Sequence, residues 1–432
     1  MPHSGPLLDR RNLLTGAAAA ALALSARGAI AQTSGLPVLS GAAKPTDAGY
    51  WEAVRGLYTV TKDVINLENG YWGIMADPVK RQFLAFNEMI NIENSYYART
   101  KFGGDLEKVR LAVVEALGAD AAEVALTRGA TEALQCLIGG YNKLKPGDTV
   151  LYADLDYDSM QYAMNWLKDR RGVDVVRFAI PEPATRQAVL DAYAKLLADN
   201  PRARLLLLTH VSHRTGLVMP VKEIAELARI RGVDVILDAA HSWGQIDFKA
   251  ADLGVDFIGF NLHKWIGAPL GAGALYIRKV RATDIDRHMG DEDWPAEDVR
   301  ARIHTGTYNF ATMLTVPAAL ALHREIGSPA KEARLRHLRN HWVGRARAIP
   351  GIEILTPDEP GMYGAITSFR FAGKGSAADN TAIVNALRDQ HKILTVRRAG
   401  IAKGQCIRVT PALYTSEADL ERFVEALQRV AA

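Results

Sequence analysis

An acid, a histidine and a lysine follow two apolar runs in the middle of the chain. Asp238 ends the run 233–237, His241 lies three residues later, and Lys264 comes shortly after the run 255–260. Such runs are typical of buried parallel strands, whose carboxyl ends form the ligand-binding edge of open α/β sheets. A lysine there can form a Schiff base with an aldehyde, and a carboxylate can hold a protonated pyridine nitrogen. We therefore expect Lys264 to be catalytic and both residues to bind pyridoxal 5′-phosphate (PLP).

The phosphate of such a cofactor also has candidate ligands. Ala130 and Thr131 lie in a small-residue turn that opens a helical pattern, where backbone N–H groups point at an anion and the Thr131 hydroxyl adds a donor. His263, beside the lysine, is a further phosphate candidate. The alternative for this turn is an ordinary capped helix, and Asp238 could equally cap one.

The ring of the cofactor would meet aromatic and imidazole groups. Tyr157 follows a strand-like run and could stack on the pyridine face, while His241 could reach the ring substituents or the phosphate. His213 is placed to face the ring oxygen, whereas His210 is as readily structural. Because no acid or cysteine joins these histidines at ligand spacing, we expect no metal site.

Arg408 interrupts the apolar run 406–410. A buried charge is costly unless it is paired, and a bidentate clamp on a substrate carboxylate would account for it. The alternative is an internal salt bridge. Arg397 and Arg398, on the preceding loop, are weaker candidates for the same role.

Alternating strand and helix patterns would position these residues. Apolar runs occur at 124–126, 149–153, 173–179, 204–209, 233–237, 256–260 and 272–277, with helical patterns at 131–140, 159–170, 186–198 and 220–231. This alternation predicts a largely parallel sheet covered by helices on both faces. A helical pattern at 78–117, broken at Gly103-Gly104, precedes the sheet. Another helical pattern at 310–348 is followed by shorter elements, some strand-like and some helical. We expect a large α/β domain at 50–310 and a smaller α+β domain at 311–432.

The N-terminus predicts export. Arg10-Arg11 in a twin-arginine pattern, an alanine-rich apolar run and a small-x-small site at 29–31 indicate a twin-arginine signal peptide over 1–31, followed by a linker at 32–49. We therefore expect a folded protein carried by the twin-arginine export machinery to the periplasm. The net charge of +4 and the absence of a basic run give no sign of nucleic-acid binding. No later run predicts a membrane span, and the two cysteines are expected to be buried thiols.

Taken in order, these motifs resemble the class V aminotransferase family of fold-type I PLP enzymes, which includes cysteine desulfurases and isopenicillin-N-epimerase-like proteins. The matching stretches are 129–133, 156–157, 210–216, 238–242, 263–264, 306–307 and 407–409. The resemblance implies a mostly parallel seven-stranded sheet and a homodimer with a shared active site. It also implies that Thr307 reaches the phosphate of the partner's cofactor.

Three departures from the family bear on the reaction, and one of them is His213, which stands at a position that often holds asparagine near the ring oxygen. The loop before Arg408 lacks the nucleophilic cysteine of cysteine desulfurases, because Cys406 belongs to the following strand. Tyr71 and Trp72 lie in a stretch that resembles the family's N-terminal substrate loop, and they suggest a partly apolar pocket. A packed aromatic turn is the alternative.

The resemblance and the residues together predict an enzyme that acts on an amino acid or an amino-acid-bearing compound, first as an aminotransferase. Epimerisation or lyase chemistry uses the same residues and stays open, as does tailoring of a siderophore side chain of the pyoverdine type, by analogy with exported relatives. A protein that binds the cofactor without turnover is the alternative from another class.

Overall fold

The computed structural model describes residues 44–431. The predicted signal peptide at 1–31 and most of the predicted linker at 32–49 lie outside these residues. Helix α2 (Ala48–Arg55) begins inside the last two positions of that linker, where the Asp47 side chain accepts a hydrogen bond from the Tyr50 amide at 3.1 Å and so caps the helix. None of the helices in residues 44–431 combines the length and the apolar character that crossing a bilayer requires.

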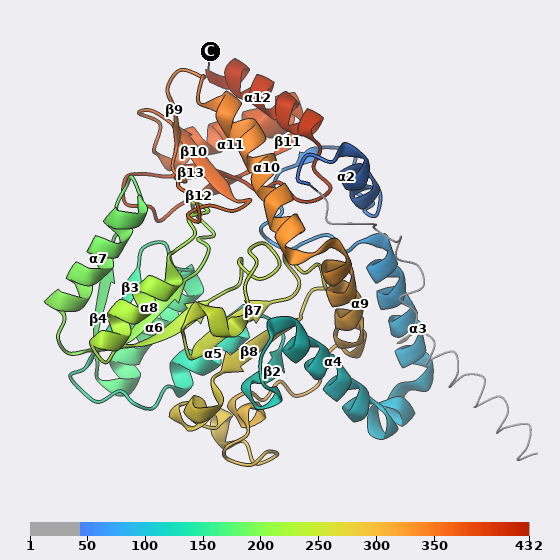
Figure 1. Cartoon of the computed structure of the whole chain (residues 1–432), viewed down its shortest axis with the longest axis vertical. Coiled ribbons are helices and arrows are strands. Elements are labelled where there is room, and N and C mark those ends of the chain that lie inside the picture. The colour runs from blue at the N-terminus through green and yellow to red at the C-terminus, as the bar shows by residue number, and fades with distance from the viewer. Residues whose placement is uncertain (1–43, 432) are drawn as a thin grey trace, which may run out of the picture. The chain divides into compact units, whose positions relative to one another are not determined.

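The apolar runs predicted as strands form one seven-stranded sheet (Figure 1), and the strand bounds lie close to the predicted ranges. Its strands are β2 (Val124–Thr127), β3 (Thr149–Ala153), β4 (Asp174–Phe178), β5 (Ala203–Thr209), β6 (Asp234–Asp238), β7 (Phe257–Asn261) and β8 (Gly273–Ile277). Their order across the sheet is β2-β8-β7-β6-β5-β3-β4. Strand β8 runs antiparallel to its two neighbours, and the other pairs are parallel. The predicted fold class is confirmed.

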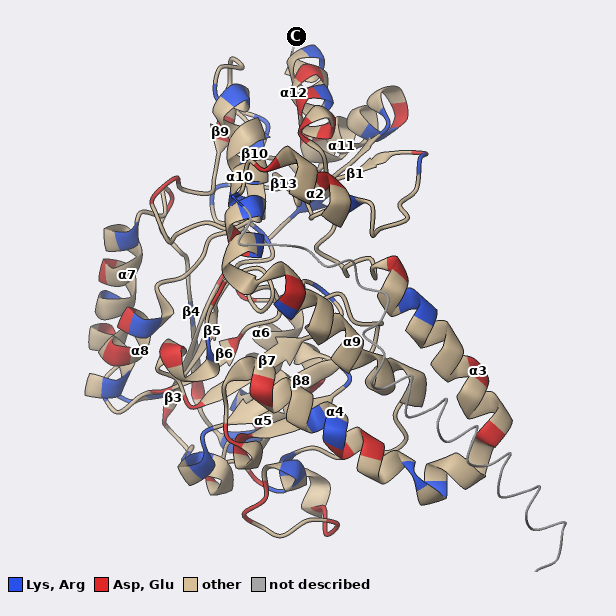
Figure 2. Cartoon of the chain, turned by 45° about the vertical axis from the view of Figure 1, so that its right-hand side comes forward, with Lys and Arg blue, Asp and Glu red and all other residues tan. Residues whose placement is uncertain are grey.

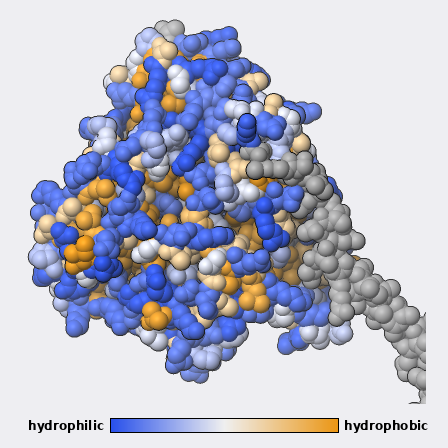
Figure 3. All heavy atoms as spheres, viewed as in Figure 1, coloured by the Kyte–Doolittle hydropathy of each residue, from blue (hydrophilic) through white to orange (hydrophobic). Residues whose placement is uncertain are grey.

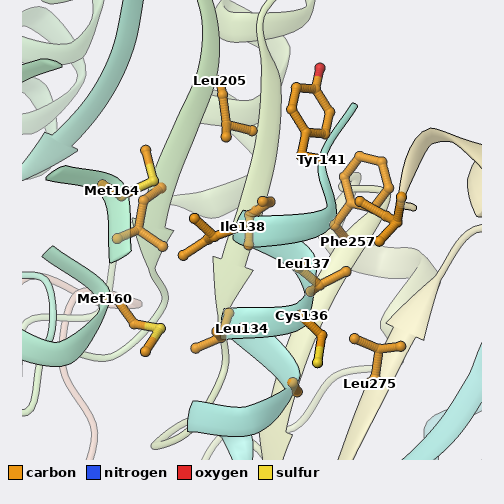
Figure 4. Close-up of a cluster of buried hydrophobic side chains, with 14 of the residues drawn as sticks. Leu134, Cys136, Leu137, Ile138, Tyr141, Met160, Met164, Leu205, Phe257 and Leu275 are labelled. Atoms are coloured by element: carbon orange, nitrogen blue, oxygen red, sulfur yellow. The ribbon is translucent and has the colours of Figure 1, made fainter. Parts of the chain in front are cut away.

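Four helices follow strands of this sheet and cover its faces: α5 (Ala130–Gly140), α6 (Asp158–Arg171), α7 (Arg186–Asp199) and α8 (Val221–Ile230). Helices α5 and α6 pack on each other, as do α7 and α8. The first pair buries its apolar side against the sheet: Leu134, Leu137 and Met164 meet Phe257 and Leu275 in one core cluster (Figure 4). Fully burying one such side chain contributes roughly 1.5–3 kcal/mol, so this cluster stabilises the packing of the two helices on the sheet.

The helical pattern at 78–117 divides into α3 (Asp77–Thr100) and α4 (Phe102–Leu117). We expected the break at Gly103-Gly104, and that expectation is wrong, because both glycines lie in the first turn of α4. The break falls at Lys101, next to Phe102, whose buried ring stacks on Phe310 with centroids 3.5 Å apart. Packing of Phe102 decides the boundary here, and the exposed glycines tolerate helical backbone.

The second helical region also divides, at Gly327, which has a φ of +84°. Helix α9 (Phe310–Ile326) packs on α3 and α4, whereas α10 (Ser328–Ala346) packs on α12 (Glu417–Ala431). The domain boundary that we placed at about residue 310 stays a prediction. Short 3-10 helices complete the path at Ala121–Glu123, Ala250–Leu253, Lys279–Asp284, His288–Gly290 and Val299–Arg302.

A smaller antiparallel sheet lies in the C-terminal part, with strand order β12-β13-β10-β9. Its strands are β9 (Ile352–Ile354), β10 (Thr367–Phe371), β12 (Val396–Arg398) and β13 (Cys406–Val409), and helix α11 (Ala377–His391) packs beside them. Strand β1 (Ile65–Asn66) pairs in parallel with β11 (Ile393–Leu394). An N-terminal segment that sequence patterns missed therefore joins this C-terminal part.

Charged side chains of both signs are interspersed over the helices (Figure 2). The face in Figure 3 is mostly hydrophilic, with smaller hydrophobic patches. In the view of Figure 2 the basic residues of the described chain alternate with acidic ones and form no continuous basic stripe, which agrees with the near-balanced charge of the sequence.

Candidate active site

The amine of Lys264 lies at the carboxyl end of β7, as predicted. Its Nζ is 2.9 Å from Nε2 of His241, which belongs to the turn after β6. The pKa of Lys264 is lowered from 10.5 to about 8, and burial is the largest cause; the negative charge of Asp238 opposes the shift, and the positive charges of Arg408 and Arg398 contribute to it. Burial, with Lys264 next in importance, also holds the pKa of His241 well below its ordinary value. The pair is therefore an uncharged imidazole beside an amine that is partly free near neutral pH.

Asp238 occupies the adjacent strand end. Its Oδ1 accepts a hydrogen bond from the Ala240 amide at 2.8 Å, so it also caps the turn that carries His241. The two roles that we left open for this residue are compatible, since one carboxylate oxygen makes the cap. Burial raises the pKa of the carboxyl group, and the Ala240 amide and the charge of Lys264 oppose that shift. Such a desolvated acid suits a cationic ring nitrogen as its partner.

The ends of β3 and β5 place Tyr157 and His213 together. The rings of these residues meet edge to face, with centroids 5.2 Å apart. Behind them, buried Asp156 accepts hydrogen bonds from the Thr209 hydroxyl at 2.6 Å and the Ala153 amide at 2.7 Å. This network locks the turn that presents Tyr157 at the start of α6. His213 is buried and its pKa is held well below the ordinary value, first by burial and then by neighbouring arginines.

The predicted phosphate turn lies where α5 begins. Thr131 is exposed, while the amide of Ala130 donates to the Asn261 side chain at 2.7 Å, so that donor is already used. His263 Nδ1 bonds the Ala272 carbonyl at 3.0 Å. A Cβ added to Gly129 would lie 3.3 Å from Cε1 of His263, so this ring borders the turn. The turn and His263 come together as expected, with Asn261 as an added part of the arrangement.

Arg408 is fully buried on β13 and carries an internal ion pair. Its Nη2 lies 2.6 Å from both carboxylate oxygens of Glu68, and its Nη1 donates to the His213 carbonyl at 2.8 Å. Arg398 Nη2 lies 3.6 Å from the same Glu68. The salt bridge that we held as an alternative is present, and the guanidinium also borders the His213 turn. A role in substrate binding stays a prediction.

The segment after Glu68 crosses from Arg408 to Lys264. The Asn69 amide group donates to the Thr410 carbonyl at 2.7 Å, and the Gly73 amide donates to the His263 carbonyl at 2.9 Å. A Cβ on Gly73 would overlap the Lys264 carbonyl oxygen, so only glycine permits this approach. Between them, Tyr71 and Trp72 form an exposed edge-to-face pair with centroids 5.0 Å apart. They are not a packed aromatic turn.

Thr307 is exposed and follows Gly306. No contact in the described residues brings it to Lys264, and the role that the resemblance implies for it concerns a partner's cofactor. That role stays a prediction.

Two groups in residues 44–431 have the composition of metal ligands: His337, His341 and Glu417, and Asp291, Asp293 and His304. Neither includes a residue of the candidate site. In the first group, Arg334 Nη1 lies 3.0 Å from the Glu417 oxygen that also meets His337, and this cation competes with a metal ion there. The expectation of no metal at the active site stays a prediction.

Comparison with known proteins identifies the family. The protein-family model described as aminotransferase class-V matches residues 83–423 of the chain. The chain belongs to this family. It is 26% identical over 396 residues to isopenicillin N epimerase of Streptomyces clavuligerus, covering 87% of this chain and 97% of that protein. It is 29% identical over 326 residues to a cysteine desulfurase of Synechococcus elongatus, covering 71% of this chain and 50% of that protein.

Solved structures confirm the fold of this family member. The cysteine desulfurase CsdA from Escherichia coli superposes with a TM-score of 0.74 at 20% identity, covering 88% of this chain and 98% of that one. A mutant of C-DES, with glycine covalently linked to its PLP cofactor, superposes with a TM-score of 0.75 at 22% identity, covering 85% of this chain and 97% of that one. Both are fold-type I enzymes.

The cofactor of this class V protein is PLP, and the residues of the candidate site fit that group. A buried carboxyl group and an amine of lowered pKa lie at neighbouring strand ends. The ring Nδ1 atoms of His213 and His241 are buried, and neither has a hydrogen-bond partner within the protein. Buried polar atoms without partners are costly, and polar substituents on a bound ring would satisfy them.

Both cysteines are free and buried, as predicted. Cys406 lies inside β13, and burial raises its pKa to about 12. Because a thiolate is the nucleophilic form, Cys406 cannot serve as a desulfurase nucleophile in this position.

Sequence reasoning missed three residues that shape the site: Glu68, Asn261 and Gln245. The Gln245 side chain donates to the His241 carbonyl at 2.6 Å and accepts from the Ala365 amide at 2.7 Å, which connects the turn that carries His241 to the C-terminal part. Asn261 was detectable, since it is a polar residue at the end of an apolar run three positions before Lys264. Glu68 gave no signal, because its partner lies 340 positions away in the sequence.

Proposed function

We propose that this class V enzyme transfers the amino group of an amino acid, or of a compound that bears one. The observation that carries the proposal is the Lys264 amine, desolvated and paired with an uncharged His241. When bound, PLP supplies a covalent site for the substrate amine and an electron sink for the bond that breaks. The remaining steps belong to side chains of this chain.

Lys264 Nζ is the base that removes the proton from the substrate α-carbon. With a pKa of about 8, the amine is partly unprotonated at neutral pH, so it can take up a proton and return it. His241 orients Nζ through the 2.9 Å contact. Asp238 supplies the negative charge that a protonated ring nitrogen needs.

A site in which Lys264 is the base favours amino transfer over epimerisation, because inversion is helped by a second proton donor on the opposite face of the substrate. Burial holds His213 and His241 in the neutral form, so neither is a ready proton donor from a second direction. Lys264 can return the proton itself, and amino transfer needs only that one carrier. The similarity to an isopenicillin N epimerase over 97% of its length favours epimerisation as the second candidate.

The test is a titration of the purified PLP-loaded protein with L- and D-amino acids, without any oxo acid. Amino transfer predicts loss of the visible cofactor band, with one oxo acid released per site. Epimerisation predicts a retained band with α-deuterium exchange from solvent. Lys264→Ala should abolish either signal, while Lys222→Ala, at an exposed position on α8, should change neither. Cofactor binding without either signal would refute the proposal in favour of a binding protein.

We also propose the assembly and location that the sequence predicts: a homodimer, exported to the periplasm. Exposed apolar side chains on α3, among them Leu84, Ile92 and Tyr96, support a subunit interface. Sedimentation of the purified protein tests the dimer, and fractionation of cells that produce the full chain, beside an Arg10→Lys and Arg11→Lys double variant, tests export.

A further inference from the structure

The arginine expected to bind the substrate carboxylate already holds a carboxylate of this chain. Glu68 presents both oxygens to Nη2 of Arg408 at 2.6 Å. Arg408 is fully buried, and a Cβ added to Gly70 would overlap its guanidinium, so the 68–70 backbone lies directly on it. A substrate carboxylate can therefore reach Arg408 only if Glu68 gives up these contacts.

The positive charge around Glu68 is not fully balanced by its carboxylate, so it can attract a second anion. One carboxylate faces two guanidinium groups, those of Arg408 and Arg398, and the Nε atom of each is buried without a partner in the protein. Buried Arg370, by contrast, meets two carboxylates, those of Glu182 and Glu353. The Glu68 cluster thus has a surplus positive charge and unused donors, and its charges also act on Lys264.

The position of Glu68 connects it to the catalytic lysine. Five residues later, the Gly73 amide bonds the carbonyl of His263, the residue before Lys264. The contact with Arg408 and the contact beside Lys264 therefore lie on one short segment, which also carries exposed Tyr71 and Trp72.

We propose that Glu68 is a specificity-determining residue: an internal carboxylate that occupies Arg408 in the free enzyme and is exchanged for the carboxylate of the substrate. This inference rests on the proposed function, since it assumes a substrate that carries a carboxylate beside its amine. Glu68 lowers the affinity for any small carboxylate, because each must compete with a tethered anion already in place. Substrates with further contacts elsewhere overcome this competition, and simple carboxylates do not.

The experiment compares the PLP-loaded wild type with Glu68→Gln, using propionate as the probe and propionamide as its uncharged match. Binding is followed by calorimetry and by the cofactor absorption band. In Glu68→Gln the Kd for propionate should fall about tenfold or more, the scale of one charge-assisted hydrogen bond, with propionamide unchanged. Glu417→Gln is the matched control, because Glu417 pairs with the buried Arg334 outside the site and should leave propionate binding unaltered.

Unchanged or weaker propionate binding in Glu68→Gln would overturn the inference and leave Glu68 as a structural partner of Arg408. If Glu68→Gln fails to fold, Glu68→Asp withdraws the carboxylate by one methylene, and it should tighten propionate binding to a smaller degree; no tightening overturns the inference as well. Amino-group release by the wild type is measured in parallel. Its absence refutes the proposed function, whereas normal release with unchanged propionate binding refutes the role of Glu68 alone.

Discussion

The lowered pKa of Lys264 makes a quantitative prediction about how the enzyme captures its cofactor. A shift from 10.5 to about 8 corresponds to about 3 kcal/mol against the charged amine. At pH 7.5 about a quarter of the Lys264 amine is then free, against about 0.1% for an ordinary lysine. Since only the free amine attacks an aldehyde, capture of PLP by the apoprotein should be on the order of 100 times faster than an ordinary lysine pKa would allow.

Stopped-flow absorbance of apoprotein mixed with PLP measures this between pH 6 and 11. We expect the capture rate to rise through a midpoint near pH 8. The same scan with N-α-acetyl-lysine gives the reference for a solvated amine and corrects for the ionisation of PLP itself. Lys264→Ala should show no covalent capture, which assigns the signal to this residue.

A midpoint at pH 10 or above would refute the reasoning, because the Lys264 amine would then behave as a solvated group. Glu68→Gln sharpens the test. The negative charge of Glu68 is among the causes that raise the pKa of Lys264, so its removal should move the midpoint below that of the wild type.

Three further predictions concern the framework of the site. Gly73→Ala should speed cofactor release, measured by dilution, because a Cβ there overlaps the Lys264 carbonyl oxygen; an unchanged release rate would show that the segment yields freely. Arg408→Ala should lower the free energy of unfolding in urea by about 1–3 kcal/mol, since Glu68 loses its nearer partner and keeps only Arg398 at 3.6 Å, and a second change, Glu68→Ala, should restore part of the loss. Burial lowers the pKa of Lys331 to about 7, so the unfolded chain binds more protons between pH 7 and 10.5 and stability should rise across that window. Lys331→Met should flatten this rise in thermal unfolding, and an unaltered pH profile would contradict the shift.

Local patterns were sufficient to predict the large sheet and the edge that carries the candidate site. Each of its strands is a short apolar run, and parallel strands share one carboxyl edge, so Asp238, His241 and Lys264 had to lie together. The helix boundary at Lys101 was not predictable in this way. It depends on Phe102 stacking on Phe310, a contact between residues more than 200 positions apart.

Features set by distant pairing escaped prediction. Strand β1 has two residues, too few to show alternation, and it exists because β11 supplies its hydrogen bonds. Arg408 stood out as a charge in an apolar run, but its partner Glu68 lies in a turn-like stretch that has no periodicity. Local sequence shows which charges need a partner, whereas the fold decides which partner they receive.

The pairing of Glu68 with Arg408 also bears on the order in which the parts of the candidate site form during synthesis of the chain. The two groups that we predict to contact PLP, Asp238 and Lys264, leave the ribosome well before β11 and β13, which hold the N-terminal segment in place. Closing a contact across 340 residues costs chain entropy that only the finished C-terminal part can offset. The nascent chain can thus bring Asp238 and Lys264 together before β11 and β13 are made, whereas the contact between Glu68 and Arg408 forms only once those strands are present.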